Sequence, residues 1–326
     1  MRILVTGSSG HLGEALVRTL RKTSHELVSI DIAPSEFTSV TGSIADRDLV
    51  AQCMHGVDAV LHTATLHKPH VATHTRQQFI DANITGTLNL LEEAVLARVK
   101  SFVFTSTTSV YGDALIPAAG LPAAWIDEDA TSVPKNIYGV TKVAAENLCQ
   151  LFHRNQKLPC LILRTSRFFP EPDDDPGMRA AFSDANIKAN EYLSRRVALD
   201  DVVSAHLLAM EQAPAIGFDR FVISATTPFT REDLAQLRED GASVLARHAP
   251  SYEKIYASLG WKMFAGLDRV YVNAHAREKL GWRPKIDFAH VLEQLELGKG
   301  LTSELASEIG IKGYHQGSYQ DGVYPI

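Results

Sequence analysis

Tyr138 and Lys142 stand four residues apart in the segment NIYGVTKVAAE. On a helix this spacing puts both side chains on one face, with the ammonium beside the phenol. A nearby ammonium lowers the pKa of a phenol toward values that allow proton transfer near neutral pH. The spacing therefore predicts an acid–base pair, although a surface tyrosine followed by a helical lysine would look the same.

A run of hydroxyl side chains lies within the segment SFVFTSTTSVYG, directly after an apolar stretch that is typical of a buried strand. Hydroxyl groups form hydrogen bonds with substrate oxygens, but no Asp or Glu stands among them to add a second acid or base. The residues of this run are Thr105, Ser106, Thr107, Thr108 and Ser109.

Three glycines, Gly7, Gly10 and Gly13, lie between the first strand pattern and the first helix pattern, in VTGSSGHLGEALV. Glycines at this place permit a tight turn and let a pyrophosphate approach the N-terminus of the helix. Asp31 ends the second strand pattern, where a carboxylate accepts hydrogen bonds from the adenosine ribose and repels a 2′-phosphate. No Arg or Lys neighbours Asp31 in DIAPSE, so the sequence favours NAD over NADP as the cofactor.

Short apolar strand patterns alternate with amphipathic helix patterns through the first half of the chain. Such alternation predicts an α/β fold, with a parallel sheet covered by helices on both faces and a binding site at the carboxyl ends of the strands. Strands are expected over 2–7, 26–31, 39–44, 58–64, 101–107, 159–166 and 218–225, and helices over 13–23, 79–97, 140–154 and 199–212.

The regular alternation stops after Ser166. The segment RFFPEPDDDPG is rich in Pro and Asp, which predicts a loop. Residues 1–166, joined by 197–225, are expected to form the NAD-binding core. Residues 167–196 and 226–326 are expected to form a smaller, helical cap that binds the substrate.

Composition disfavours several classes of protein. The net charge is −6 and Lys and Arg form no dense run, which argues against a nucleic-acid or anionic-membrane surface. Three cysteines lie far apart, which favours a reducing compartment without disulfide bonds. The chain opens on a strand pattern, MRILVTG, and no stretch approaches the roughly 18 apolar residues of a membrane span. A cytoplasmic protein without a signal peptide is expected.

In order and spacing, the motifs TGxxGxxG, Asp31, NITGT, STTSVYG and YxxxK resemble those of the extended short-chain dehydrogenase/reductase superfamily. That family contains NAD-dependent sugar epimerases, dehydratases and dehydrogenases with a Rossmann-type, doubly wound sheet. The resemblance covers residues 1–170 and, more loosely, RRVALDDVVSAH and LGWRPKIDF. It implies that Thr107 is the catalytic hydroxyl, Tyr138 the acid–base residue, and Lys142 its electrostatic partner and a ribose ligand.

The resemblance also implies which residues contact NAD. Ser43 stands where the family usually has an Asp after the third strand, which weakens one contact on the adenine side. Asn83 is the helix asparagine of the N-x-x-G-T pattern. The expected cofactor contacts are Gly7, Gly10, His11, Leu12, Gly13, Asp31, Ser43, Ile44, Thr63, Ala64, Asn83, Tyr138 and Lys142.

Thr108 and Ser109 occupy positions where family dehydratases carry an acid, so the resemblance disfavours dehydration. The reaction that remains for these residues is hydride transfer with a single proton shuttle. His67 and Thr108 are expected to face the substrate. His70 and His74 stand four apart, but without the Glu of an HExxH motif or a nearby Cys they predict no metal site.

Arg167 and Arg179 lie where the chain departs from sugar-nucleotide epimerases, in LRTSRFFPEPDDDPGMR. Arg167 stands at the usual position of an Asn, and the short PEP segment looks more like that of uronate dehydrogenases. Both guanidinium groups are expected to bind an anionic substrate group. Ion pairs with the aspartates at 173–175 are the alternative.

Three functions remain open: an NAD-dependent sugar or sugar-nucleotide epimerase, which is favoured; an NAD-dependent sugar-acid dehydrogenase; and a non-catalytic dinucleotide sensor. The intact Thr107, Tyr138 and Lys142 argue against the sensor. Family members often pair the helices that here span 79–97 and 138–154, so a homodimer is expected. Its apolar seam would contain Leu88, Leu91, Val95, Leu148 and Leu151.

Overall fold

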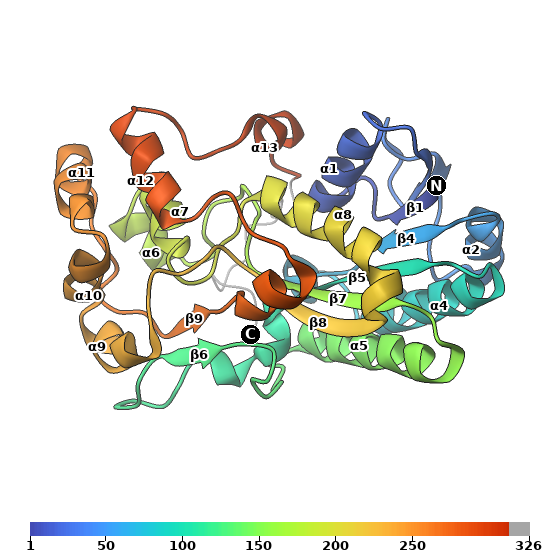
Figure 1. The fold of residues 1–326 in the computed structure, drawn as a ribbon, viewed down its shortest axis with the longest axis horizontal. Helices are drawn as coiled ribbons and strands as arrows, with labels where there is room; N and C mark the ends of the chain where they lie inside the picture. The colour runs from blue at the N-terminus through green and yellow to red at the C-terminus, as the bar shows by residue number, and fades with distance from the viewer. Residues whose placement is uncertain (313–326) are drawn as a thin grey trace.

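Seven strands form a parallel sheet at the centre of the structure, a computed structural model that describes residues 1–312 (Figure 1). Their order is β3-β2-β1-β4-β5-β7-β8, and every neighbouring pair is parallel. This confirms the predicted Rossmann-type sheet, although β3 has only two residues. The strands are β1 (Arg2–Thr6), β2 (Glu26–Asp31), β3 (Val40–Thr41), β4 (Ala59–His62), β5 (Ser101–Thr107), β7 (Cys160–Thr165) and β8 (Phe218–Ile223).

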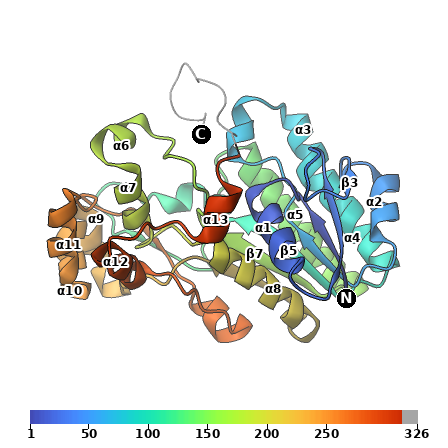
Figure 2. The same ribbon diagram turned by 90° about the horizontal axis from the view of Figure 1, so that it is seen from above.

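Helices cover both faces of this sheet, as Figure 2 shows. Alternate strand residues enter the two cores, so that Val103 of β5 packs on one face and Phe102 on the other. Strands buried on both faces are apolar at successive positions, which is why FVF of β5 and CLIL of β7 are continuous apolar runs. One face carries α1 (His11–Leu20) and α8 (Leu199–Ile216), and the other carries α2 (Arg47–Met54), α4 (Gly86–Leu96) and α5 (Ile137–Gln156).

The strand order reverses between β1 and β4. From β1 the chain runs outward to β2 and β3, and then returns across the sheet to β4, β5, β7 and β8. In open α/β sheets, ligands bind beyond the carboxyl ends of the strands at such a reversal. The glycine loop follows β1, and the loop with Thr63 and Ala64 follows β4, so two predicted cofactor segments meet here.

A group of short helices packs beside the sheet, at the left of Figure 1. Its core contains the buried side chains of Leu237, Tyr256 and Phe288. This part was expected to be helical, but it also holds a parallel pair of strands, β6 (Ala124–Ile126) and β9 (Arg269–Tyr271). Three residues are too few for a strand pattern to show in the sequence. The helices are α6 (Pro176–Ala181), α7 (Asp184–Glu191), α9 (Leu234–Glu239), α10 (Gly241–His248), α11 (Ser251–Leu259) and α12 (Phe288–Glu296).

The helix expected over 79–97 is preceded by α3 (Arg76–Ile80) and contains a π-helical segment before α4. Near the end of the described chain, α13 (Glu304–Ile309) packs against α1 and α8. Within residues 1–312, no helix is both long and apolar enough to cross a membrane. Residues 313–326, the end of the predicted cap, lie outside the described residues. Short 3₁₀ or π helices span Lys68–Ala72, Asp81–Thr85, Thr108–Tyr111, Asp113–Leu115, Arg231–Asp233 and Ala276–Leu280.

Candidate active site

A cavity of about 720 Å³ lies along the carboxyl ends of β1, β2, β4, β5 and β7. This volume is typical of small-molecule and cofactor sites. All the residues predicted to bind cofactor or substrate line the cavity, except Asn83 and Arg179. The fold therefore gathers the predicted motifs of the first half of the chain in one place, together with the loop after β7.

The glycine loop between β1 and α1 forms part of the cavity wall. Gly7 has a φ of +74°, a left-handed conformation that other residues rarely adopt. A Cβ atom at Gly13 would lie 1.9 Å from the carbonyl oxygen of Gly7, so the helix can approach the turn only without a side chain there. Gly10 caps α1 without a side-chain hydrogen bond. The N-terminal amides of α1 are left open to bind an anion such as a pyrophosphate.

The Asp31 carboxylate, at the end of β2, is held beside the glycine loop. Its Oδ2 accepts a hydrogen bond from the Ser9 amide at 2.9 Å, and its Oδ1 accepts one from the Ala33 amide at 2.8 Å. Each carboxylate oxygen keeps a further lone pair that can accept from a ribose hydroxyl. The glycine loop and Asp31 together fit the pyrophosphate and the adenosine ribose of NAD.

Thr107 at the end of β5 and Tyr138 in the first turn of α5 come together in the cavity. The Thr107 hydroxyl lies close enough to the phenol to lower its pKa, and Thr107 Oγ1 accepts a hydrogen bond from the Ser109 amide at 3.1 Å. Asn136 begins α5 because its side-chain oxygen accepts from the Gly139 amide at 3.1 Å. This cap fixes the helical turn that carries the phenol to the strand end.

The Lys142 ammonium is buried one turn further along α5. Its Nζ donates a hydrogen bond to the Thr105 carbonyl oxygen at 2.6 Å and lies 4.0 Å from the centre of the Phe104 ring. Because β4 pairs with β5 only as far as Phe104, the Thr105 carbonyl beyond it can accept this bond. Burial lowers the pKa of Lys142 to about 7, against the opposing charge of Glu146.

The expected lowering of the Tyr138 pKa is wrong for this structure. Burial raises the pKa of the phenol to about 12, and the Thr107 hydroxyl offsets only part of this effect. Lys142 does not counteract it, because its ammonium donates to the Thr105 carbonyl oxygen instead. At neutral pH the phenol is therefore protonated, and its loss of a proton requires a positive charge closer to it.

A buried ion pair that the sequence reasoning missed fixes α5 against the sheet. Glu146 Oε2 lies 2.7 Å from Arg164 Nη2 of β7, and Glu146 Oε1 accepts a hydrogen bond from Ser106 Oγ at 2.5 Å. Glu146 stands one turn beyond Lys142, so these contacts set the position of Tyr138 and Lys142 relative to β5 and β7. The sequence contained one signal for the role of Glu146. This residue follows Lys142 by four positions, the same spacing by which Lys142 follows Tyr138.

Asn83 does not line the cavity, in contrast to the predicted contact with NAD. Its Oδ1 accepts from the Leu66 amide at 2.8 Å, and its Nδ2 donates to the Leu66 carbonyl and to the Thr141 hydroxyl, each at 2.9 Å. The side chain thereby fixes the loop after β4, which carries Thr63 and His67 into the cavity wall. Asn83 supports the site through this loop because its own polar atoms are engaged there.

His67 lines the cavity and stacks on Phe169, with 5.6 Å between the ring centres. This contact joins the loop after β4 to the loop after β7. His70 and His74 lie next to it, with 5.0 Å between their ring centres. Within residues 1–312, no group of three His, Cys, Asp or Glu side chains is placed to hold a metal ion.

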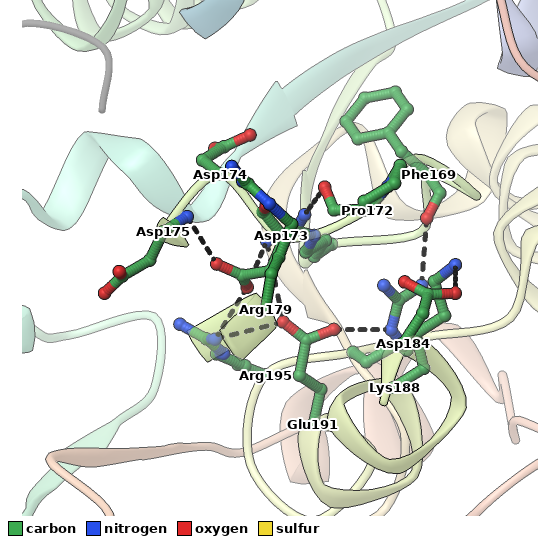
Figure 3. Close-up of polar contacts among 12 residues, drawn as sticks. Phe169, Pro172, Asp173, Asp174, Asp175, Arg179, Asp184, Lys188, Glu191 and Arg195 are labelled. Atoms are coloured by element: carbon green, nitrogen blue, oxygen red, sulfur yellow. Dashed lines mark hydrogen bonds and ion pairs between the residues drawn. The ribbon is translucent and has the colours of Figure 1, made fainter. Parts of the chain in front are cut away.

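Arg167 and Arg179 both contact Asp173, but only Arg167 forms the ion pair that the sequence left open as an alternative. Arg167 Nη1 lies 3.1 Å from Asp173 Oδ2, and Arg179 donates to the Asp173 carbonyl oxygen (Figure 3). Only Arg167 of the two lines the cavity. Other cations reach the cavity from separate segments, so no local pattern indicated them. They are Lys68, Lys135, Arg195, Arg269 and Lys312.

Comparison with known proteins identifies the family. Residues 3–223 match the NAD dependent epimerase/dehydratase family. The chain belongs to this family. The matched range contains the glycine loop, Thr107, Tyr138 and Lys142, and the match confirms the family expected from those motifs.

Curated relatives in this family carry different activities. An uncharacterized UDP-glucose epimerase of Bacillus subtilis is 31% identical over 186 residues, which are 50% of this chain and 55% of that protein. A uronate dehydrogenase of Pseudomonas syringae pv. tomato is 30% identical over 183 residues, which are 53% of this chain and 62% of that protein. The chain thus spans little more than half the length of either relative.

Solved structures share the fold over nearly the whole chain. A short-chain dehydrogenase/reductase superfamily protein from Agrobacterium tumefaciens, with bound NAD, has a TM-score of 0.66 and 24% identity and covers 91% of this chain and 96% of that chain. A UDP-glucose 4-epimerase from Thermotoga maritima, with UDP-glucose, has a TM-score of 0.61 and 23% identity and covers 91% and 98%. At these identities the likeness shows the fold alone.

Proposed function

We propose that the protein is an NAD-dependent sugar or sugar-nucleotide epimerase that acts by hydride transfer at a carbinol carbon. The observation that carries this proposal is the contact between the Thr107 and Tyr138 hydroxyl groups inside the cavity that the glycine loop borders. Two hydroxyls at such a place can hold one substrate oxygen and exchange one proton with it.

The residues around the cavity fit NAD. The open amides at the N-terminus of α1 would hold its pyrophosphate, Asp31 its adenosine ribose, and Lys142 its second ribose. When bound, NAD supplies the hydride acceptor. We favour NAD over NADP because the Asp31 carboxylate would repel a 2′-phosphate.

Tyr138 would carry the proton while Thr107 orients the substrate oxygen. With a pKa of about 12, the phenol holds its proton at neutral pH. To act as a base it needs the Lys142 ammonium to leave the Thr105 carbonyl and approach the phenol. The neighbouring Thr108 and Ser109 supply no carboxylate, so the site has no second acid there for dehydration.

Contacts around the glycine loop favour an epimerase over a dehydrogenase. Glu171 lies 3.1 Å from His11 in this loop, and the Lys312 amide donates to Glu171 at 3.2 Å. The loop after β7, through Glu171, and the chain around Lys312 therefore border the cavity next to the place where the pyrophosphate is proposed to bind. Contacts at this place would slow the release of NAD. An epimerase returns the hydride to the same substrate and needs no exchange of cofactor between turnovers, whereas a dehydrogenase must release it.

A sugar-acid dehydrogenase is the second candidate, and one observation favours it. Arg167 and Arg195 line the cavity next to the loop after β7, where a carboxylate would find cationic partners. The two candidates predict different products. The epimerase would isomerise its substrate, whereas the sugar-acid dehydrogenase would release NADH in proportion to the sugar acid that it oxidises.

A substrate screen tests the proposal. The protein is incubated with NAD and with free sugars, uronates and sugar nucleotides, while NADH release and isomer formation are both followed. Isomer formation without net NADH supports the epimerase, and NADH in equal amount to oxidised substrate supports the dehydrogenase. Binding of NAD with neither reaction supports the sensor.

Tyr138→Phe supplies the control for the screen. Removing the only proton carrier assigned to the site is expected to lower kcat by roughly 10²–10⁴. NAD should still bind, as calorimetry can measure, because the glycine loop and Asp31 are proposed to hold its pyrophosphate and adenosine ribose. Turnover equal to that of the wild type would remove Tyr138 from the mechanism.

A further inference from the structure

Two hydroxyls of the run at the end of β5, those of Thr105 and Ser106, have no role in the proposed hydride transfer. Successive side chains of a strand point to opposite faces of a sheet, and α8 and α5 cover these two faces (Figure 1). Ser106 Oγ donates to Glu146 of α5 at 2.5 Å. On the other face, Thr105 Oγ1 lies 2.7 Å from His206 Nε2 of α8. The two hydroxyls therefore attach the end of β5 to one helix on each face.

The second nitrogen of the His206 ring fixes the direction of the hydrogen bond with Thr105. His206 Nδ1 lies 2.8 Å from the Val202 carbonyl oxygen, one turn back in α8. Because a carbonyl oxygen only accepts, Nδ1 carries the proton of the neutral ring, and Nε2 must accept. Burial keeps the ring neutral, since it lowers the pKa of His206 to about 4. The Thr105 hydroxyl is therefore the donor.

His206 is closed off from the cavity. Its side chain is fully buried and does not line the cavity, whereas Thr105 does. Both ring nitrogens have partners, which is the usual state of a buried polar side chain. The ring cannot contact a ligand in the cavity, so any effect of His206 on the chemistry must pass through Thr105.

The backbone of Thr105 connects this hydrogen bond to Lys142. The Thr105 carbonyl oxygen accepts from Lys142 Nζ at 2.6 Å. On one edge of β5, Thr105 pairs with Leu163 of β7, but on the other edge the pairing with β4 ends at Phe104. The carbonyl thus belongs to a residue that a neighbouring strand supports on one edge alone. The bond from its hydroxyl to α8 is a further restraint on the position of this residue.

We propose that His206 is a positioning residue for Lys142. Through the Thr105 hydroxyl it fixes the carbonyl oxygen that holds the ammonium, and so it sets the place from which Lys142 approaches the Tyr138 phenol and the cofactor ribose. The inference rests on the hydride-transfer function proposed above, in which Lys142 must leave this carbonyl. His206 itself transfers no proton, because its Nδ1 proton is held by Val202 and its ring does not reach the cavity.

The titration of Lys142 in the full chain, before NAD is added, tests this inference without any substrate. Lysine labelled with ¹³C at Cε gives a signal that follows the ionisation of the ammonium, and Lys142→Met identifies this signal by its loss. The bond to the carbonyl favours the charged form, so a carbonyl that is no longer fixed should stabilise it less. The pKa of Lys142 is about 7 in the wild type. Thr105→Val and His206→Leu are each expected to lower it by roughly one pH unit.

Conservative variants separate positioning from packing. Thr105→Ser keeps the hydroxyl, and His206→Gln keeps a side-chain acceptor and donor, so both should leave the Lys142 titration close to that of the wild type. Combining Thr105→Val with His206→Leu should shift it no further than either change alone, because both residues act through one hydrogen bond. Thr105→Val is nearly isosteric, so it decides the outcome if His206→Leu does not fold.

Ser101→Ala is the matched control. It removes another buried hydroxyl of β5, one that has no hydrogen-bond partner within residues 1–312, and it should not shift the Lys142 titration. The titratable groups around Lys142 stay in place in all of these variants. Glu146 and Cys149 of α5 act on the ammonium, whose charge acts in turn on His62 of β4. A shift in the variants therefore reports on the Thr105 carbonyl.

Urea unfolding of the same variants distinguishes the outcomes. If Thr105→Val and His206→Leu lower the free energy of unfolding but leave the Lys142 titration where it is, the hydrogen bond merely stabilises the fold and the inference is overturned. A shift no larger than that of Ser101→Ala would overturn it as well. A Lys142 shift that depends on Thr105 and His206, in a protein that transfers no hydride to any substrate, would instead refute the proposed function and leave the positioning role in place.

Discussion

His11 Nε2 in the glycine loop lies 3.1 Å from Glu171 Oε1 in the loop after β7, and both side chains are almost completely buried. Burial raises the pKa of Glu171, but the hydrogen bond and charge of His11 and the Lys312 amide outweigh this and lower it. The Lys312 ammonium in turn pairs with Glu14 in the first turn of α1. Three distant segments are thus tied together at the place where the pyrophosphate is proposed to bind.

Glu171→Gln should make NAD dissociate faster, because it removes the charge that ties the loop after β7 to His11. Loss of a charged hydrogen bond of about 1.5 kcal/mol corresponds to roughly a tenfold faster dissociation. Stopped-flow displacement of bound NAD measures this rate. Glu296→Gln, an exposed glutamate of α12, is the matched control. Equal rates in the two variants would show that the contact does not retain the cofactor.

Asp31 is expected to select NAD over NADP. Its carboxylate is fixed by the Ser9 and Ala33 amides and would meet the 2′-phosphate of NADP directly. Asp31→Ala removes the repulsion, so the difference in affinity between NAD and NADP should narrow. Calorimetric titration of both dinucleotides into the wild type and the variant checks this. Equal affinities in the wild type would contradict the assignment.

Lys142 should make stability depend on pH in the alkaline range. Burial holds its pKa at about 7 in the folded protein, below the ordinary value of 10.5, so the unfolded chain binds more protons between these values. The cost of burying the ammonium is greatest below pH 7, and the free energy of unfolding should rise with pH through this window. The slope is at most about 1.4 kcal/mol per pH unit.

Urea unfolding at a series of pH values measures the Lys142 effect. Lys142→Met is expected to remove this part of the slope, whereas Lys254→Met, at an exposed position of α11, should keep it. A slope that is the same in wild type and Lys142→Met would show that Lys142 is not the group that titrates.

The expected homodimer needs an apolar surface on α4 and α5. Leu91 cannot contribute, because it is fully buried against the sheet, whereas Val140 and Leu151 are 49% and 39% exposed. We predict that Val140→Glu combined with Leu151→Glu halves the mass measured by light scattering at micromolar concentration, because charges would be buried in the seam. Leu297→Glu, an exposed position after α12, should leave the mass unchanged. A monomeric wild type would rule out the dimer.

Local patterns predicted the order of the elements and the position of the main chemical groups. The glycine spacing requires a turn between a strand and a helix, and continuous apolar runs such as CLIL require burial on both faces of a sheet. The spacing of Tyr138 and Lys142 follows from the pitch of one helix. Each of these features depends on neighbours within a few residues, so the sequence contains it directly.

Only the tertiary structure decided which charged groups are buried and which partners they have. It brought Lys142 to the Thr105 carbonyl and raised the pKa of Tyr138 by burial, against the prediction from spacing alone. It also placed Asp173 between Arg167 and Arg195, of which the sequence had indicated only one. A pKa or an ion pair depends on solvent exclusion and on groups from distant segments, and no local pattern contains that information.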